Sequence, residues 1–205
     1  MKILAIGAHP DDIEFGCAGA ILNWVDEGHD VSVLVMTPGD RGGDPAVRKR
    51  EQKKAAALMG VKKVYWGTFS DTQLTQNINA MIVEIEKVVA KVKPDYALFN
   101  SAEDGHQDHR ALNKAAVTAT RWVKNVAFFE VPSSQNFFPT LFADITKNFD
   151  QKMKALLAHR SQHLKTHIQG LSITDAARAT AVFRGVQSRV RFAEGFIPLR
   201  LFIGA

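Results

Sequence analysis

The chain alternates short apolar runs with longer segments in which apolar and polar residues recur at helical spacing. The apolar runs have the length and β-branched character of buried strands, and they lie at 3–6, 31–36, 64–67, 96–99 and 126–130. The amphipathic segments predict helices at 17–27, 47–59, 78–92, 107–123, 149–157 and 176–184. Closing strands are predicted at 189–196 and 199–203. This alternation predicts an α/β fold with a mostly parallel sheet.

Two of these strands end abruptly in clusters of ionisable side chains. The first is followed by His9-Pro10-Asp11-Asp12, and the fourth by the polar segment 100–109, which ends in His106-Gln107-Asp108-His109. Proline cannot donate to a sheet ladder, so Pro10 ends the first strand and suits the start of a helix. Because parallel strands end at the same edge of a sheet, we expect both clusters in one active site at the carboxyl ends of the strands.

The two clusters together offer His9, Asp12 and His109 as ligands for a divalent metal ion. Two imidazole nitrogens and one carboxylate oxygen leave a coordination position open for water, which is typical of catalytic zinc rather than of a closed structural site. A plainer interpretation is that Asp11 and Asp12 only cap the following helix. The neighbouring histidine and the second cluster favour the metal site.

The remaining residues of the clusters suit the hydrolysis of an amide. Asp11 lies beside a ligand without being needed for coordination, so we expect it to act as the general base toward a water molecule. His106 lies three residues before His109 on the same helical face, and we expect it to stabilise an oxyanion as an imidazolium. Asp108 is expected to orient His106.

The motifs Ala8-His9-Pro10-Asp11-Asp12 and His106-Gln107-Asp108-His109 closely resemble the two signature motifs of the LmbE/PIG-L-type zinc-dependent N-deacetylases. The resemblance covers most of the chain through further landmarks in the family order, among them Gly28-His29-Asp30-Val31, Pro94-Asp95, His159-Arg160-Ser161-Gln162 and Ala193-Glu194-Gly195-Phe196. Two positions depart from the family pattern. Pro38 stands where many members carry a basic residue, and Ile13 interrupts the commoner acidic run.

This resemblance implies a Rossmann-like three-layer sandwich and one deacetylase domain over residues 1–205. It implies removal of an acetyl group from an N-acetylglucosamine-type amino sugar, with zinc or another divalent metal as cofactor. It also implies a homo-oligomer, since many relatives form one. The family pattern assigns the metal to His9, Asp12 and His109, the base to Asp11 and oxyanion stabilisation to His106. These roles agree with those expected from the residues themselves.

The charge of the chain bears on the expected substrate. The formal net charge of +5 at pH 7 suggests an anionic partner. Arg41 and Arg48 follow the second strand, at the end of the sheet where the metal is expected, and could clamp a phosphate or carboxylate. We therefore expect an N-acetylated amino sugar with a negatively charged or bulky aglycone, for example one that is phosphate- or nucleotide-linked, with both arginines as binding residues. The alternative is that both are solvated surface charges.

Three further histidines, His159, His163 and His167, recur at helical spacing beyond the predicted helix 149–157. Their stripe formally resembles a second metal site. Neither a carboxylate nor a cysteine accompanies them in the pattern, so a polar helix face is the favoured interpretation.

Other features point to a cytoplasmic protein. Cys17 is the only cysteine, so an internal disulfide is excluded and a reducing compartment is compatible. The apolar segment at the amino terminus is too short for a signal peptide, and no apolar run approaches the length of a transmembrane segment.

Two other function classes compete with the deacetylase hypothesis. One is a Rossmann-like module that binds a nucleotide or nucleic acid, and the other is a metal-binding family member without catalytic activity. The nucleotide fingerprint Gly-x-Gly-x-x-Gly does not follow the first strand, where Asp11 and Asp12 would instead repel a phosphate. The interleaved aromatic and basic residues of a nucleic-acid groove are also absent. The presence of Asp11, His106 and Asp108 favours an active enzyme.

Overall fold

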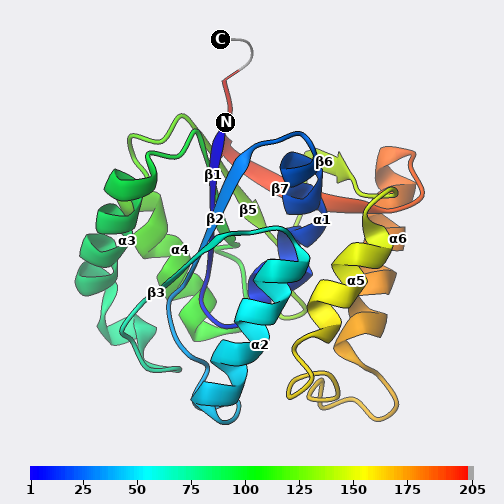
Figure 1. The fold of residues 1–205 in the computed structure, drawn as a ribbon, viewed down its shortest axis with the longest axis horizontal. Helices are drawn as coiled ribbons and strands as arrows, with labels where there is room; N and C mark the ends of the chain where they lie inside the picture. The colour runs from blue at the N-terminus through cyan, green and yellow to red at the C-terminus, as the bar shows by residue number, and fades with distance from the viewer. Residues whose placement is uncertain (203–205) are drawn as a thin grey trace.

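The computed structural model describes residues 1–202, in which seven strands form one sheet between layers of helices (Figure 1). The strands are β1 (Lys2–Gly7), β2 (Asp30–Val35), β3 (Lys63–Trp66), β4 (Tyr96–Asn100), β5 (Asn125–Phe129), β6 (Leu141–Asp144) and β7 (Ala193–Arg200). The helices are α1 (Asp12–Asp26), α2 (Pro45–Leu58), α3 (Ile78–Val92), α4 (Gln107–Ala119), α5 (Phe149–Leu157) and α6 (Ile173–Ser188), with a 3₁₀ turn at Leu74–Gln76. No helix in this part of the chain combines the length and apolar character that a membrane span requires.

The strands lie in the order β3-β2-β1-β4-β5-β7-β6, and the first five of them run parallel. Strand β1 is central: Ile6 pairs with Leu34 of β2 on one side and with Phe99 of β4 on the other. The chain moves from β1 toward β3 in one direction and from β4 toward β5 in the other. Such a reversal places a binding crevice outside the carboxyl ends of the two central strands. Both polar clusters leave the sheet at that point.

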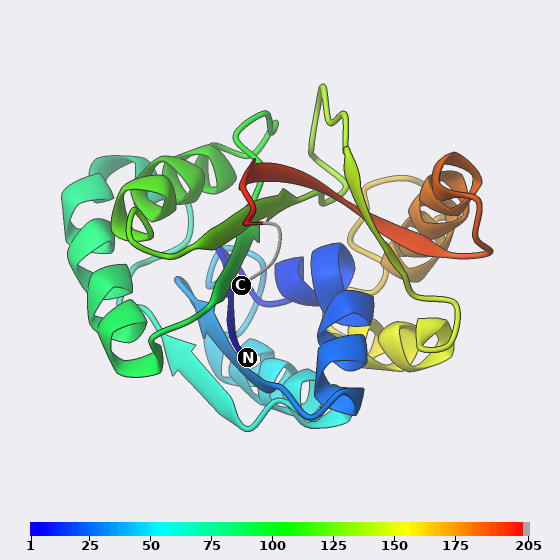
Figure 2. The same ribbon diagram turned by 90° about the horizontal axis from the view of Figure 1, so that it is seen from above.

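Helices cover both faces of the sheet and bury two separate cores (Figure 2). On one face Ile3 and Ala5 of β1 contribute to a core with α1, α2 and α5. On the other face Leu4 and Ile6 contribute to a core with α3 and α4. Successive side chains of β1 therefore point into opposite cores. This explains why its sequence is continuously apolar instead of alternating.

The predicted fold class is confirmed, but the carboxyl-terminal strands differ from the prediction. The two closing strands expected at 189–196 and 199–203 are one strand, β7, because α6 extends to Ser188 and Arg189 ends it with a φ of 65°. Pro198 does not break β7, since it pairs with Ala127 beside a register irregularity. Ile203 lies outside the described residues. Strand β6 was not predicted, because its four residues give too short a pattern.

The expected helical stripe of histidines is wrong. Helix α5 ends at Leu157, and the chain continues through 159–167 as successive turns. His159 is fully buried, whereas His167 is exposed and has a φ of 59°. A positive φ cannot continue a right-handed helix, so the three rings do not share a face.

Helix α1 is interrupted near its start, at Cys17, whose φ of −148° and ψ of 16° are not helical. The interruption leaves backbone N–H groups of the next turn without helical acceptors. The buried Glu194 carboxylate of β7 accepts from two of them, the N–H groups of Gly19 and Ala20, each at 2.8 Å. Glu194 thus caps the second part of α1 from a distant strand.

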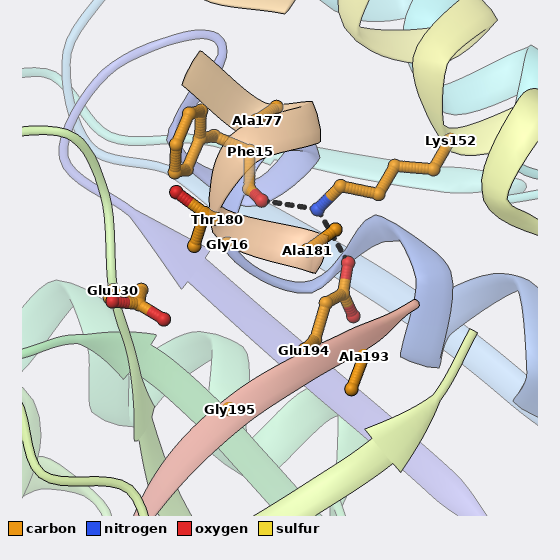
Figure 3. A pocket seen from close by; sticks show the side chains of 10 residues that line it. All are labelled: Phe15, Gly16, Glu130, Lys152, Ala177, Thr180, Ala181, Ala193, Glu194 and Gly195. Atoms are coloured by element: carbon orange, nitrogen blue, oxygen red, sulfur yellow. Dashed lines mark hydrogen bonds and ion pairs between the residues drawn. The ribbon is translucent and has the colours of Figure 1, made fainter. Parts of the chain in front are cut away.

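Lys152 of α5 completes this arrangement (Figure 3). Its ammonium donates to the Phe15 carbonyl, on the other side of the interruption, and to Glu194 Oε1 at 2.6 Å. The side chain of Lys152 is only 2% exposed, so its charge depends on this carboxylate for compensation. The ion pair therefore ties α1, α5 and β7 together behind the first turn of α1.

Lys152→Ala is expected to lower the free energy of unfolding by about 3–5 kcal/mol, because it leaves the Glu194 carboxylate buried without its cation. Urea denaturation measures the change. Lys154→Ala is the matched control, since Lys154 lies on the same helix but is exposed, and it should change stability by less than about 0.5 kcal/mol. Similar losses in the two variants would contradict the assignment.

Candidate metal centre and active site

A cavity of about 410 Å³ opens at the carboxyl ends of β1 and β4. Its lining comes from the two polar clusters and from the segments that follow β2, β3, β5 and α5: His9, Asp11, Asp12, Arg41, Gly42, Arg48, Asp71, Thr72, His106, His109, Ser133, Gln162 and Lys165. The structure thus brings together all the residues predicted to bind metal, to catalyse or to bind substrate except Asp108, whereas His159, His163 and His167 do not line the cavity. Asp108 is fully buried behind His9.

Three donor groups converge at the base of this cavity. His9 Nδ1 lies 3.3 Å from His109 Nε2. The Asp12 carboxylate lies between them, with Oδ2 at 3.7 Å from His9 Nδ1 and Oδ1 at 3.4 Å from His109 Nε2. Metal–ligand bonds of about 2.0–2.2 Å in a tetrahedral site separate the ligand atoms by roughly 3.3–3.6 Å. The three groups therefore have the spacing and chemistry of a divalent-metal site.

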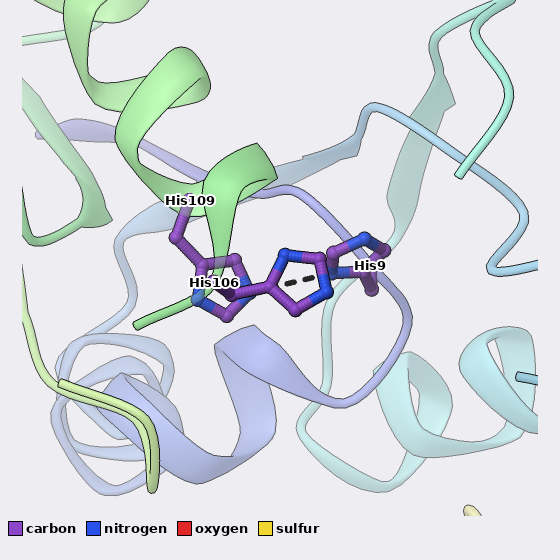
Figure 4. Close-up of side chains that lie close together, drawn as sticks. All are labelled: His9, His106 and His109. Atoms are coloured by element: carbon purple, nitrogen blue, oxygen red, sulfur yellow. Dashed lines mark hydrogen bonds between the residues drawn. The ribbon is translucent and has the colours of Figure 1, made fainter. Parts of the chain in front are cut away.

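His9 could also contribute to two other donor groupings, with His106 and His109 or with Asp71 and Asp108. Figure 4 shows the three histidines grouped between the start of α4 and the loop after β1. On the other side of the His9 ring, Nε2 lies 3.0 Å from Asp71 Oδ1 and 3.3 Å from Asp108 Oδ2. A carboxylate behind an imidazole fixes the ring and leaves the opposite nitrogen free for a metal. His9 Nδ1 is thus the nitrogen that faces the cavity.

His109 is held in the same way. Its Nδ1 lies 3.1 Å from Asp104 Oδ1 and 3.4 Å from the Ser133 hydroxyl, so Nε2 is turned toward Asp12. Asp104 is buried and also accepts from the His106 N–H at 2.8 Å. Both histidines therefore have one nitrogen engaged by a carboxylate and the other directed at the same point.

The carboxylates also set the protonation of the site. Burial alone would lower the pKa of His9, but hydrogen bonds to Asp108 and Asp71 outweigh it and raise the pKa to about 9. Burial likewise opposes the charge of His109, and the Asp12 and Asp104 carboxylates raise its pKa to about 10. The His109 charge in turn keeps the pKa of Asp12 low despite burial. Both imidazoles therefore favour the protonated form, and the neighbouring carboxylates balance that charge.

Asp11 occupies an unusual backbone conformation at the start of α1. Its φ of 96° and ψ of −24° are left-handed, which is costly for a residue other than glycine. Burial raises the pKa of its carboxyl to about 6, although the Arg48 and His159 charges act in the opposite direction. A carboxylate that titrates this close to neutrality is suited to accept and return a proton.

His106 caps α4, since its Nδ1 accepts from the N–H of Asp108 at 3.2 Å. Burial and the charges of His9 and His109 lower its pKa. A ring that accepts at Nδ1 and resists protonation is a neutral imidazole with its proton on Nε2. The structure therefore indicates a neutral hydrogen-bond donor at this position, where the sequence analysis expected an imidazolium.

The role expected for Asp108 is also corrected. Its carboxylate accepts from the N–H groups of Thr72 at 2.6 Å and Leu74 at 3.3 Å, and it contacts His9. Only its backbone N–H contacts His106. Asp108 thus orients His9 and anchors the loop after β3, because the first turn of α4 points its side chain toward β1.

Several residues of the site were not predicted: Asp71, Asp104, Ser133, Gln162 and Lys165. Asp71 follows β3 and Asp104 follows β4, so both lie just beyond the carboxyl ends of parallel strands. The rule that located the two clusters could have located these acids as well. Gln162 and Lys165 come from the turns after α5. Gln162 belongs to the family landmark His159-Arg160-Ser161-Gln162, which could have pointed to it, whereas Lys165 lies outside that landmark.

The two arginines expected to bind substrate differ in their surroundings. Arg41 is exposed at the edge of the cavity. Arg48 is 4% exposed, and its guanidinium donates to the carbonyls of Pro10 at 2.7 Å and Gly39 at 2.9 Å and lies 3.4 Å from Asp11 Oδ2. A Cβ at Gly39 would lie 1.9 Å from this guanidinium, so the loop needs glycine there. The guanidinium of Arg48 therefore contacts Asp11 and the neighbouring backbone, and it is not free to bind a substrate anion as the sequence suggested.

Comparison with known proteins gives consistent matches. A family described as PIG-L, GlcNAc-PI de-N-acetylase, matches residues 4–120. An uncharacterized deacetylase of Escherichia coli (strain K12), YaiS, is 32% identical over 169 residues, which cover 78% of this chain and 90% of the relative. A diacetylchitobiose deacetylase of Thermococcus kodakarensis is 30% identical over 227 residues, which cover 96% of this chain and 83% of the relative.

Solved structures of similar fold include a deacetylase of the same kind. The solved structure of N,N′-diacetylchitobiose deacetylase from Pyrococcus horikoshii, in complex with an inhibitor, superposes with a TM-score of 0.85. It is 27% identical in sequence, and the match covers 97% of this chain and 83% of that protein. The similarity therefore extends beyond the two polar clusters to the whole sheet and its helices.

Binding of a divalent ion to this site is expected to release protons, because His9 and His109 have pKa values of about 9 and 10 and would be protonated without it. The apparent affinity should therefore rise by about tenfold to 100-fold per pH unit between pH 6 and pH 8. Calorimetry in buffers of different ionisation enthalpy measures the protons released. An affinity that does not change with pH would show that the ion binds elsewhere.

Proposed function

Since the chain belongs to the PIG-L family of GlcNAc-PI de-N-acetylases, we propose that it hydrolyses the acetamide of an N-acetylglucosamine-type amino sugar at a divalent metal ion. The observation that carries the proposal is the convergence of His9 Nδ1, His109 Nε2 and the Asp12 carboxylate within 3.3–3.7 Å of one another. Two relatives named as diacetylchitobiose deacetylases support the substrate class, because that sugar contains N-acetylglucosamine-type units.

We assign the ion to His9, Asp12 and His109, with zinc as the expected metal. A bound divalent ion of this kind would lower the pKa of a water molecule and polarise the amide carbonyl. The three ligands are all at least nine-tenths buried, so the ion would sit at the base of the cavity with its open side toward substrate. This ligand set leaves room for water, as catalytic sites require.

The remaining side chains of the site transfer protons, stabilise developing charge or orient the metal ligands. Asp11 accepts a proton from the attacking water and can return it to the departing amine. His106 donates from Nε2 to the oxygen on which negative charge develops. Asp71, Asp104 and Asp108 hold the two ligand histidines.

The alternative of a nucleotide-binding module is less well supported. The turn from β1 into α1, which would contact a phosphate in such a module, carries Asp11 and the first helical residue, Asp12. Both carboxylates line the cavity, and two acidic groups there would repel an anion. A metal-binding protein without activity would not need a partly buried Asp11 in a strained backbone.

The rim of the cavity supports a finer proposal about the substrate. Arg41 and Lys165 line the cavity from opposite segments, one after β2 and one after α5, and both are exposed. Lys165 donates to the Gly42 carbonyl, which keeps it near Arg41. We propose that these two cations bind a phosphate or carboxylate on the aglycone. The homo-oligomer and the cytoplasmic location stay predictions.

Asp11→Asn is expected to keep the metal and to lose about 10²- to 10⁴-fold in turnover, because the amide cannot accept a proton. Metal analysis together with steady-state kinetics on diacetylchitobiose measures both effects. His109→Ala is the contrasting variant and should lose the metal as well as activity. Near-normal turnover of Asp11→Asn would assign the base to another residue.

Arg41→Ala and Lys165→Ala are each expected to raise KM about three- to tenfold for an amino sugar with an anionic aglycone, and to leave KM for neutral diacetylchitobiose unchanged. Lys53→Ala, which removes an exposed cation from α2 away from the cavity, is the matched control. Equal effects on both substrates would show that the two cations do not recognise an anionic aglycone. The proposed deacetylation of amino sugars in general would be unaffected.

A further inference from the structure

A second polar cluster lies behind the cavity, and its link to the chemistry described above is the effect of the His159 charge on the pKa of Asp11. Glu14, Gln52 and His159 are each 0% exposed. Gln52 Nε2 donates to Glu14 Oε1 at 2.6 Å, and Glu14 Oε2 lies 3.2 Å from His159 Nε2 as an ion pair. Burial alone would lower the pKa of His159, but Glu14 outweighs it and the pKa is raised. Burial of such a group is costly, so its place in the fold needs an explanation.

The cluster is attached to the segment that carries the catalytic acids. Glu14 lies in the first turn of α1, two residues after Asp12 and three after Asp11. Gln52 lies on α2, four residues after Arg48, so the two side chains share one helical face. Arg48 contacts Asp11 and the carbonyl of Pro10. Two side chains one turn apart on α2 therefore contact the start of α1, one at Pro10 and Asp11 and the other at Glu14.

His159 extends this grip to a third segment. It begins the turns after α5, and the next residues of those turns reach the rim of the cavity through Gln162 and Lys165. The same turns are joined to α2 independently, since Glu51 accepts from the N–H of Ser161 at 2.9 Å and from its hydroxyl at 2.6 Å. The Glu51 contact does not involve α1. Removing the Glu51 contact would therefore loosen the turns after α5 without releasing the start of α1.

The start of α1 has a particular need for such support. Asp11 is left-handed at φ 96°, and a single residue in that conformation persists only where its surroundings determine it. Asp12 follows directly and must keep its carboxylate between His9 and His109. A small rotation of the first turn would move both acids at once.

We propose that Glu14 and His159 are positioning residues: together with Gln52 they form a brace that fixes the first turn of α1, so that Asp12 meets the metal and Asp11 meets the water. This inference rests on the proposed metal-dependent function. The brace acts through Asp11 and Asp12, and neither Glu14 nor His159 needs to contact substrate.

The test compares Glu14→Gln, His159→Leu and the double variant Glu14→Met/His159→Leu with the wild-type chain. Zinc affinity is measured by chelator competition. The values of kcat and KM are measured with diacetylchitobiose as substrate, and stability is measured by thermal unfolding. Both single variants are expected to lose about 10- to 100-fold in zinc affinity and in kcat, as for other groups that orient a ligand, with KM changed less than about twofold.

The double variant separates positioning from stability. An apolar pair of similar volume can replace a buried ion pair without loss of stability, so this variant is expected to fold even where a single variant does not. It should still show the reduced zinc affinity and kcat. Glu51→Ala is the matched control, because it releases the same turns from α2 but leaves α1 held, and it should keep wild-type zinc affinity.

Two results would overturn the brace. One is a folded double variant with wild-type zinc affinity and kcat, and the other is an equal loss in Glu51→Ala. A wild-type chain that binds no zinc would instead overturn the proposed function, and the brace with it. A wild-type chain that binds zinc but has no deacetylase activity would contradict the proposed reaction. The differences in zinc affinity among the variants would still test whether the brace exists.

Discussion

Buried carboxylates hold the two imidazoles that face each other across the cavity, and the arrangement of the site depends on these contacts. Asp71 and Asp108 engage Nε2 of His9, and Asp104 engages Nδ1 of His109. Each ring therefore turns its other nitrogen toward the same point, where a cation would satisfy both. The sheet makes these contacts available, because β1, β3 and β4 are parallel and end at one edge. The order of the strands thus determines which side chains can meet in the site.

Such a concentration of ionisable groups is unfavourable for folding, and the surrounding structure offsets it by pairing. The raised pKa values of His9 and His109 and the lowered pKa of Asp104 all reflect charges that stabilise one another out of water. The left-handed Asp11 adds backbone strain at the centre of this network. Conflicts of this kind between local preference and global fold are typical of functional sites. The site is organised for chemistry at some expense of stability.

Much of this organisation could be predicted from the sequence, and the failures have physical reasons. The continuous apolar run of β1 and the regular helix of 78–92 are determined locally, so hydrophobic periodicity located both. The convergence of His9 with His109 follows from the parallel-strand rule, although 100 residues separate them. The partner of Asp108 could not be inferred, because helical spacing pairs residues within one element and the actual contact joins two. The turns after α5 were misjudged as helix for a related reason: His159 is placed by burial against Glu14, which no local pattern records.

The proposed function requires that a divalent ion binds on the Nδ1 side of His9, between Asp12 and His109. Anomalous diffraction at the zinc edge from crystals of the zinc-loaded protein tests it most directly. We expect a peak about 2.0–2.2 Å from His9 Nδ1, His109 Nε2 and an Asp12 oxygen. A peak on the Nε2 side of the same ring, between Asp71 and Asp108, would contradict it.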